Sequence, residues 1–231
     1  MKNDKDTYCS ERDIYLIAGV GSSLSIFNDC RHELQKRFRE AGRDPIIREL
    51  FPYGDRTHNL IYQILEVRGD LSRLRGTGRY GGRAVAELVS QLSPRRPVLF
   101  IGHSGGGVAA YQAAVMLNKD NIIPDCRIIQ VGSPKLPIHT ELCNRVSYFL
   151  AVDEEGKRND PITRIGSWGG WSRNRLGLWF WDKLKYAPGH IGTIQVLGGH
   201  PHYFRHKAPY VHPDLGSNLS LTLDTIWIHS I

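Results

Sequence analysis

The sequence has neither an apolar run long enough for a transmembrane helix nor the apolar core of a secretory signal. None of its apolar runs reaches the length of a transmembrane helix. The N-terminus, Met1–Asp6, is charged and has no apolar core of the kind that a secretory signal needs. We therefore expect a cytoplasmic location.

Cysteine is also scarce. The four residues, Cys9, Cys30, Cys126 and Cys143, are widely and irregularly spaced, and no C-x-x-C pair occurs. This spacing argues against a zinc site or a redox motif. No pattern demands a disulfide. Cys30 and Cys126 lie in apolar stretches and are expected to be buried thiols. We expect neither a metal nor an organic cofactor.

The overall composition is that of a soluble globular protein. Hydrophobic residues make up 41% and charged residues 23% of 231 residues, a length that fits one α/β domain spanning 1–231. The formal net charge is +7 and the sequence pI about 9.3. The basic residues are mostly dispersed, and no nucleic-acid-binding module is recognisable. Nucleic acid is therefore not an expected partner.

The most informative segment is G-x-S-x-G at 102–106. An apolar run, Val98–Ile101, leads into Gly102-His103-Ser104-Gly105-Gly106, and a helix-prone stretch begins at Val108. Strand, tight turn and helix in this order place a serine on a sharp turn with its hydroxyl exposed. Glycines flank the serine because the adjacent elements leave no room for a Cβ. Ser104 is the candidate nucleophile.

Apolar periodicity predicts alternating strands and helices. The expected strands cover 14–18, 45–51, 98–101, 127–131, 146–152 and 194–197. Helical spacing is found at about 25–41, 83–92 and 215–230, and residues 60–67 also favour a helix. Gly76–Gly82 is expected to be an arginine-rich loop. This alternation predicts an α/β fold with a mainly parallel sheet and helices on both faces.

A nucleophilic serine needs a base, and the base needs an orienting acid. On this kind of scaffold the acid and then the histidine follow the serine along the chain. His200 comes directly after the last predicted strand, and His202 is its main rival. For the acid, Asp153 lies closest to the end of the strand at 146–152, whereas Asp160 lies in a polar turn further on. The local chemistry leaves these two acids nearly even.

Four motifs in order resemble those of the class 3 lipases, a family of α/β-hydrolases. Gly102–Gly107 is similar to the G-H-S-x-G-G elbow, and Gly132-Ser133-Pro134 to the G-S-P that ends the next strand. Asn159–Ile165 resembles the segment N-D-x-[VI]-x-R-[LI], and His200–Phe204 resembles H-x-x-Y-[FW]. The resemblance covers residues 102 to 204. It implies Ser104, Asp160 and His200 as the catalytic triad, with His202 and Asp153 as alternates.

The oxyanion of such a reaction needs two backbone donors. One is expected from Gly105, the residue after the nucleophile, and the other from Val20 or Gly21 in the glycine-rich turn after the first strand. The alternative for that turn is an ordinary loop without a catalytic role.

Residues 167–188 hold four of the five tryptophans, mixed with arginine and lysine. The tryptophans either pack into the core or face an acyl chain or a membrane surface, in which case the segment is a lid or insert.

Taken together, the sequence predicts a lipase-like or esterase-like serine hydrolase that cleaves small-molecule or lipid esters. The alternatives are a thioesterase or amidase with the same triad, or a non-catalytic module that binds lipid or protein through the same fold.

Overall fold

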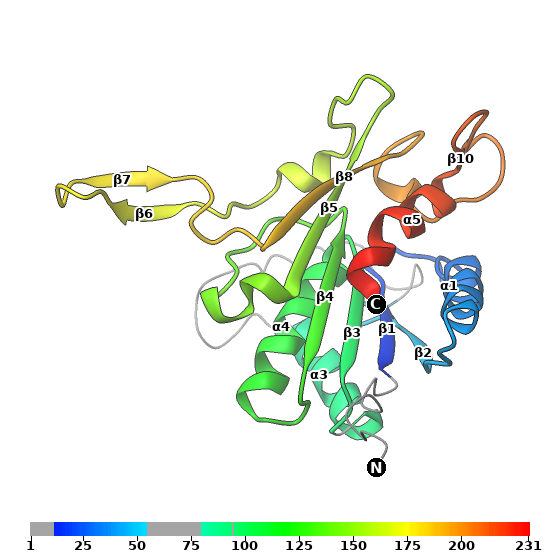
Figure 1. The fold of residues 1–231 in the computed structure, drawn as a ribbon, viewed down its shortest axis with the longest axis horizontal. Coiled ribbons are helices and arrows are strands. Elements are labelled where there is room, and N and C mark those ends of the chain that lie inside the picture. The colour runs from blue at the N-terminus through cyan, green and yellow to red at the C-terminus, as the bar shows by residue number, and fades with distance from the viewer. Residues whose placement is uncertain (1–11, 55–79, 94) are drawn as a thin grey trace, which may run out of the picture.

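The computed structural model describes residues 12–54, 80–93 and 95–231, which form a parallel sheet enclosed by helices (Figure 1). The six strands lie in the order β2-β1-β3-β4-β5-β8, and every neighbouring pair is parallel. Their bounds are β1 Asp13–Ile17, β2 Ile47–Leu50, β3 Val98–His103, β4 Cys126–Val131, β5 Val146–Val152 and β8 His190–Gln195. Parallel strands need covering on both faces, and the chain supplies this with four helices among the described residues.

Helices α1 (Asn28–Glu40) and α5 (Asn218–Ser230) cover one face of the sheet, and α3 (Tyr80–Leu92) and α4 (Gly105–Lys119) cover the other (Figure 1). Alternate residues of one strand serve the two cores. Ile14 and Leu16 pack beneath α1 and α5, whereas Tyr15 and Ile17 pack beneath α3 and α4. The predicted fold class, a mainly parallel sheet with helices on both faces, is confirmed.

Most predicted elements are present with small changes at their ends. The strand at 146–152 has the predicted bounds, and the C-terminal helix is capped by Ser217, whose side chain accepts a hydrogen bond from the Ser220 N–H. Cys30 and Cys126 are buried free thiols, as expected. The last strand was predicted at 194–197 but runs from His190 to Gln195. As an edge strand with a largely exposed first half, it lacks the apolar run that marks the inner strands.

The expected loop at Gly76–Gly82 is partly wrong, because α3 begins at Tyr80 and includes Gly81 and Gly82. Both glycines are buried where a side chain would collide with neighbours. A Cβ at Gly81 would lie 2.5 Å from the Tyr53 ring, and one at Gly82 would meet Gln112 of α4. Close packing of α3 therefore outweighs the low helix propensity of glycine. Residues 76–79 and the predicted helix at 60–67 lie outside the described residues.

Short elements complete the chain. Three 3-10 helices are η1 (Thr140–Arg145), η2 (Pro161–Arg164) and η3 (His200–His202). Strands β6 (Gly170–Arg173) and β7 (Trp179–Asp182) form a hairpin, and β9 (Val211–His212) pairs with β10 (Gly216–Ser217). In the described ranges, no helix combines the length and apolarity required to cross a membrane.

The contact between α4 and β1 depends on Gly106, which gives a first prediction. A Cβ at this position would collide with the backbone carbonyl of Ile17. We expect Gly106→Ala to lower the free energy of unfolding by at least about 2 kcal/mol, because the backbone cannot yield without separating α4 from the sheet. Urea unfolding measures this.

The matched control is Gly156→Ala, where φ is +77° but no atom lies within 4 Å of the new methyl group. It should lose only about 1 kcal/mol, from the left-handed backbone. Equal losses in the two variants would show that steric contact at Gly106 is not the cause.

Candidate active site

Ser104 occupies a strained turn between β3 and α4. Its backbone has φ 56° and ψ −131°, a conformation that residues other than glycine rarely adopt. The turn is held by hydrogen bonds on both sides, since the Ser104 N–H donates to the Val131 carbonyl at 3.0 Å and its carbonyl accepts from Gly107 at 3.1 Å. Such strain costs about 1–3 kcal/mol and is characteristic of functional sites. It places the hydroxyl at the carboxyl end of the sheet.

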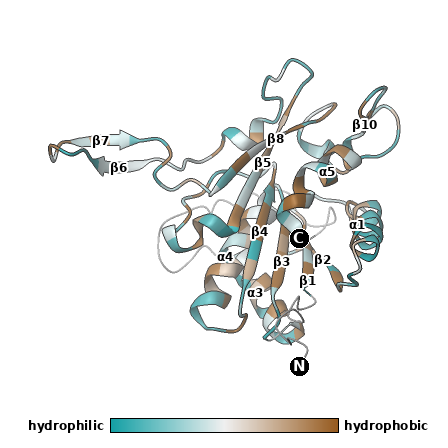
Figure 2. Ribbon diagram, viewed as in Figure 1, coloured by the Kyte–Doolittle hydropathy of each residue, from teal (hydrophilic) through white to brown (hydrophobic). Residues whose placement is uncertain are grey.

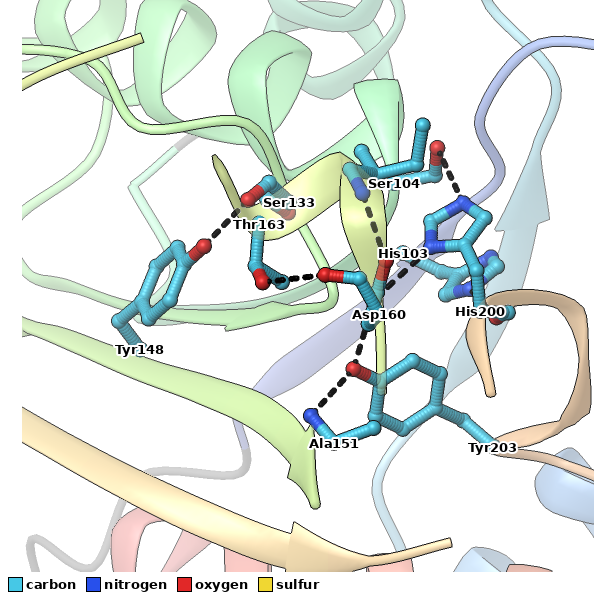
Figure 3. A network of polar contacts seen from close by, with 10 residues as sticks. His103, Ser104, Ser133, Tyr148, Ala151, Asp160, Thr163, His200 and Tyr203 are labelled. Carbon is cyan, nitrogen blue, oxygen red and sulfur yellow. Dashed lines mark hydrogen bonds and ion pairs between the residues drawn. The ribbon is translucent and has the colours of Figure 1, made fainter. Parts of the chain in front are cut away.

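His200 lies beside Ser104 and joins it to Asp160 (Figure 3). The His200 Nε2 is 3.0 Å from the Ser104 Oγ, and its Nδ1 is 2.9 Å from the Asp160 Oδ2. An ionised carboxylate only accepts hydrogen bonds, so Nδ1 carries the proton and the Nε2 lone pair faces the serine hydroxyl. This tautomer is the one that a general base acting on Ser104 requires.

Asp160 is fully buried, and its charge is compensated by three donors. The Oδ1 accepts from the Ile162 N–H at 2.9 Å, which makes Asp160 the N-cap of η2. The Oδ2 accepts from His200 and from the Tyr203 hydroxyl, the latter at 2.8 Å. A buried carboxylate without such partners would be strongly destabilising. The network therefore fixes both the charge and the orientation of Asp160.

Tyr203 is a component of the site to which the sequence reasoning gave no role. It is fully buried, donates to Asp160, and accepts from the Ala151 N–H of β5 at 2.7 Å (Figure 3). Burial and the negative charge of Asp160 raise the pKa of Tyr203, so it remains a donor. The motif H-x-x-Y-F was the only signal in the sequence that pointed to it.

His103 packs against His200 and holds its position. The two rings stack with centroids 5.0 Å apart and an angle of 23° between their planes. The His103 Nε2 lies 3.1 Å from the His200 carbonyl oxygen, which can only accept, so Nε2 carries the proton. Burial is the main cause that lowers the pKa of His103 to about 3, and the charge of the adjacent His200 is the second cause. A neutral His103 thus holds the loop that carries His200.

The alternates for the base and the acid, His202 and Asp153, contact other groups. His202 stacks on Tyr210, with a 2.9 Å hydrogen bond between its Nε2 and the tyrosine hydroxyl. Asp153 accepts hydrogen bonds from the backbone N–H groups of Glu155 and Lys157 and so closes its own loop. Neither side chain joins the contacts of Ser104.

A cavity of about 190 Å³ opens at Ser104, and its walls include His200, Val20 and Gly21. The turn after β1 approaches the elbow closely, since a Cβ on Gly19 would lie 2.6 Å from the Ser104 Cβ and 2.9 Å from the Gly105 nitrogen. The first N–H groups of a helix have no acceptor within the helix. Gly105 begins α4, so its N–H belongs to this class.

Arg205 also lines this cavity and was not identified from the sequence. It also lines a neighbouring cavity of about 330 Å³, whose walls include Lys207 and the His206–Asp29 pair, 3.1 Å apart. No sequence motif marks Arg205. Among the described residues, no cluster of three or more histidine, cysteine, aspartate or glutamate side chains is arranged to hold a metal ion.

No protein-family model matches the chain, and no curated protein sequence does so either. Several solved structures resemble it. The product of gene lin2722 from Listeria innocua matches with a TM-score of 0.49 and 14% identity over 94% of this chain and 93% of that one. RedJ, a thioesterase from the prodiginine biosynthetic pathway in Streptomyces coelicolor, gives a TM-score of 0.48 and 13% identity over 87% and 86%. The mature Bacillus licheniformis lipase BlEst2 gives a TM-score of 0.33 and 16% identity, over 55% of this chain and 42% of that one.

The low pKa of His103 predicts a pH-dependent stability. Because this folded-state pKa lies below the ordinary value of 6.5, the contribution of neutral His103 is complete above about pH 6.5 and is lost as the pH falls toward 3. This residue alone should give a slope of at most about 1.4 kcal/mol per pH unit in that window. Urea unfolding from pH 7 to pH 4 measures the slope.

In His103→Gln the slope should become smaller, because the buried group no longer titrates. The control His32→Gln removes an exposed histidine on α1 and should keep the original slope. An unchanged slope in His103→Gln would mean that other groups cause the acid sensitivity.

Proposed function

We propose that the protein is a serine hydrolase that cleaves carboxylic esters through an acyl-enzyme on Ser104. The observation that carries this proposal is the line of contacts from the Ser104 hydroxyl through His200 to the buried Asp160, with the serine held in a strained turn. The four motifs that resemble class 3 lipases lend support to an ester as the substrate.

In the first half of the reaction, the Ser104 Oγ attacks the ester carbonyl while the His200 Nε2 takes the hydroxyl proton. Asp160 keeps the imidazole in the required tautomer and stabilises the imidazolium by its negative charge. The bond to the leaving alcohol then breaks, and His200 returns the proton to the alcohol oxygen. This leaves the acyl group on Ser104.

The second half repeats these steps with water. His200 takes a proton from water, the resulting hydroxide attacks the acyl carbonyl, and the carboxylic acid is released as Ser104 recovers its proton. The oxyanion of each tetrahedral intermediate is assigned to the Gly105 N–H and to one amide from Val20 or Gly21. Fixed amide dipoles of this kind stabilise the developing charge without reorganisation.

Ser104→Ala tests the proposal directly. Turnover of p-nitrophenyl esters should fall by at least about 10³-fold, because the proposed acyl-enzyme forms on the Ser104 hydroxyl. Labelling by a fluorophosphonate should disappear as well. Mass spectrometry of the intact protein measures the labelling.

The control Ser90→Ala changes a partly exposed serine on α3 and should leave turnover and labelling intact. Labelling that persists in Ser104→Ala would locate the nucleophile elsewhere. Turnover of an ester, a thioester and an amide with the same acyl group identifies the preferred bond. Vesicle binding without any turnover would instead support a non-catalytic module.

The two adjoining cavities favour substrates that carry a negative charge. Of the described residues that line the Ser104 cavity, Arg205 is the one with a permanent charge. The neighbouring cavity adds Lys207 and one carboxylate, Asp29, which pairs with His206. In the described part of the chain, the Arg205 guanidinium has no ion-pair partner. We therefore propose that it binds an anionic group on the substrate, such as a carboxylate or phosphate.

Arg205→Gln should raise KM for an ester that bears a distal carboxylate by roughly tenfold, since a hydrogen bond to a charged group is worth about 1.5 kcal/mol. KM for the matching neutral ester should change less than about twofold. Lys119→Gln, which removes the same charge at the end of α4, controls for the overall field. Equal effects of Arg205→Gln on both esters would contradict a direct contact.

A further inference from the structure

The hairpin of β6 and β7 stands apart from the rest of the molecule. Within the described ranges its two strands pair only with each other, and it projects away from the central sheet (Figure 1). At its base, Trp168 is buried and meets Tyr148 of β5 edge-on, with centroids 4.9 Å apart. The Trp168 carbonyl also accepts from the Tyr186 N–H at 2.9 Å. The base is thus anchored in the core while the strands extend into solvent.

The projecting part exposes large apolar side chains. Only Trp168 of the four tryptophans in 167–188 packs into the core, so a wholly buried tryptophan cluster, one of the alternatives from the sequence, is wrong. The tip carries Leu176, which is 84% exposed, and Leu178, which is 62% exposed, and Figure 2 shows hydrophobic colour at this tip next to hydrophilic positions. The exposed aromatic residues are Trp171, Trp179, Phe180 and Trp181. Exposed apolar surface of this extent marks an interaction site.

Both faces of the hairpin take part. Trp171 pairs with Trp181, and their rings meet edge-on at 5.7 Å. On the same face, Arg173 lies over the Trp179 ring at 4.5 Å. Phe180 points to the opposite face, because successive residues of a strand alternate. A partner protein that contacts one face would leave the other in water, whereas a lipid surface surrounds the hairpin on all sides.

The charges near the hairpin are almost all positive. Between residues 170 and 185, four cations (Arg173, Arg175, Lys183 and Lys185) accompany a single carboxylate, Asp182. Arg175 lies in the same turn as Leu176 and Leu178, and the other cations accompany the tryptophans. Aliphatic, aromatic and cationic side chains together are the composition that favours the interface of an anionic bilayer.

We propose that this hairpin binds the surface of membranes rich in anionic lipids and inserts Leu176 and Leu178 among the lipids. The outer edges of a two-stranded hairpin carry backbone groups without partners, which cannot enter the hydrocarbon core. The insertion is therefore shallow and ends at the level of the tryptophans. This binding does not depend on the esterase proposal, since none of its residues belongs to the Ser104 network.

Flotation of the full-length protein with vesicles tests the inference. Vesicles of phosphatidylcholine with 30% phosphatidylserine (roughly the charge density of an anionic leaflet) should bind the protein at least about tenfold more tightly than pure phosphatidylcholine. Binding should weaken at high salt because surface charges are screened. Insertion should also shift tryptophan fluorescence to shorter wavelength.

Two variants separate the components of binding. Leu176→Ser with Leu178→Ser should weaken binding to anionic vesicles by at least about tenfold through lost apolar burial. Arg175→Gln with Lys183→Gln should weaken it by about tenfold through lost attraction to the headgroups. The control Ile228→Ser removes an exposed apolar side chain of α5, and Ser104→Ala removes the nucleophile; both should bind vesicles as the parent protein does.

Several outcomes would overturn the inference. One is equal binding to neutral and anionic vesicles, and another is undiminished binding by the leucine variant. The parent protein could instead form dimers that are lost in the leucine variant and fail to bind vesicles. That result would make a second copy of the chain the partner of the hairpin. Tight binding to single-stranded nucleic acid but not to vesicles would assign the aromatic residues to base stacking.

Discussion

The buried charge of Asp160 is the constraint on which the rest of the site depends. A carboxylate with no solvent exposure is tolerated only if its oxygens are satisfied, and the three donors come from two parts of the chain. Ile162 supplies a backbone amide from η2, whereas His200 and Tyr203 come from the segment after β8. Because Tyr203 also binds Ala151, the charge fastens that segment to β5. Satisfying one carboxylate therefore also aligns the imidazole with Ser104.

The surroundings of His200 combine a rigid support with an open side. His103 stacks on one side of the ring and stays neutral because it is buried, so no second positive charge opposes an imidazolium on His200. The Nε2 edge of the ring faces Ser104, and the cavity lined by His103, Ser104 and His200 lets solvent and substrate enter there. The G-H-S-x-G segment thus contributes a support and a reactive hydroxyl from adjacent residues, whose side chains point in different directions.

The two proposals place recognition on different physical interactions. At the Ser104 cavity, Arg205 offers a fixed charge beside a small, partly enclosed space. At the hairpin, Leu176 and Leu178 offer exposed apolar surface outside any cavity. The first arrangement selects a molecule by its charge, and the second selects an extended surface by its polarity. A lipid ester at an anionic membrane would satisfy both, whereas a small anionic ester would need only the first.

The sequence by itself determined the parallel sheet, its two covering layers of helices and the serine turn, because each depends on a local pattern of apolar residues and glycines. It predicted the bounds of β5, but it missed the hairpin, because the exposed aromatic residues there are equally typical of a buried core. Position along the chain left Asp153 and Asp160 nearly even. Only the tertiary structure brought Asp160 to His200, 40 residues away, and His200 to Ser104, 96 residues away. Such contacts depend on the paths of the loops after neighbouring strands and on which carboxylate is hydrogen-bonded when buried. A local pattern of apolar residues predicts neither of these.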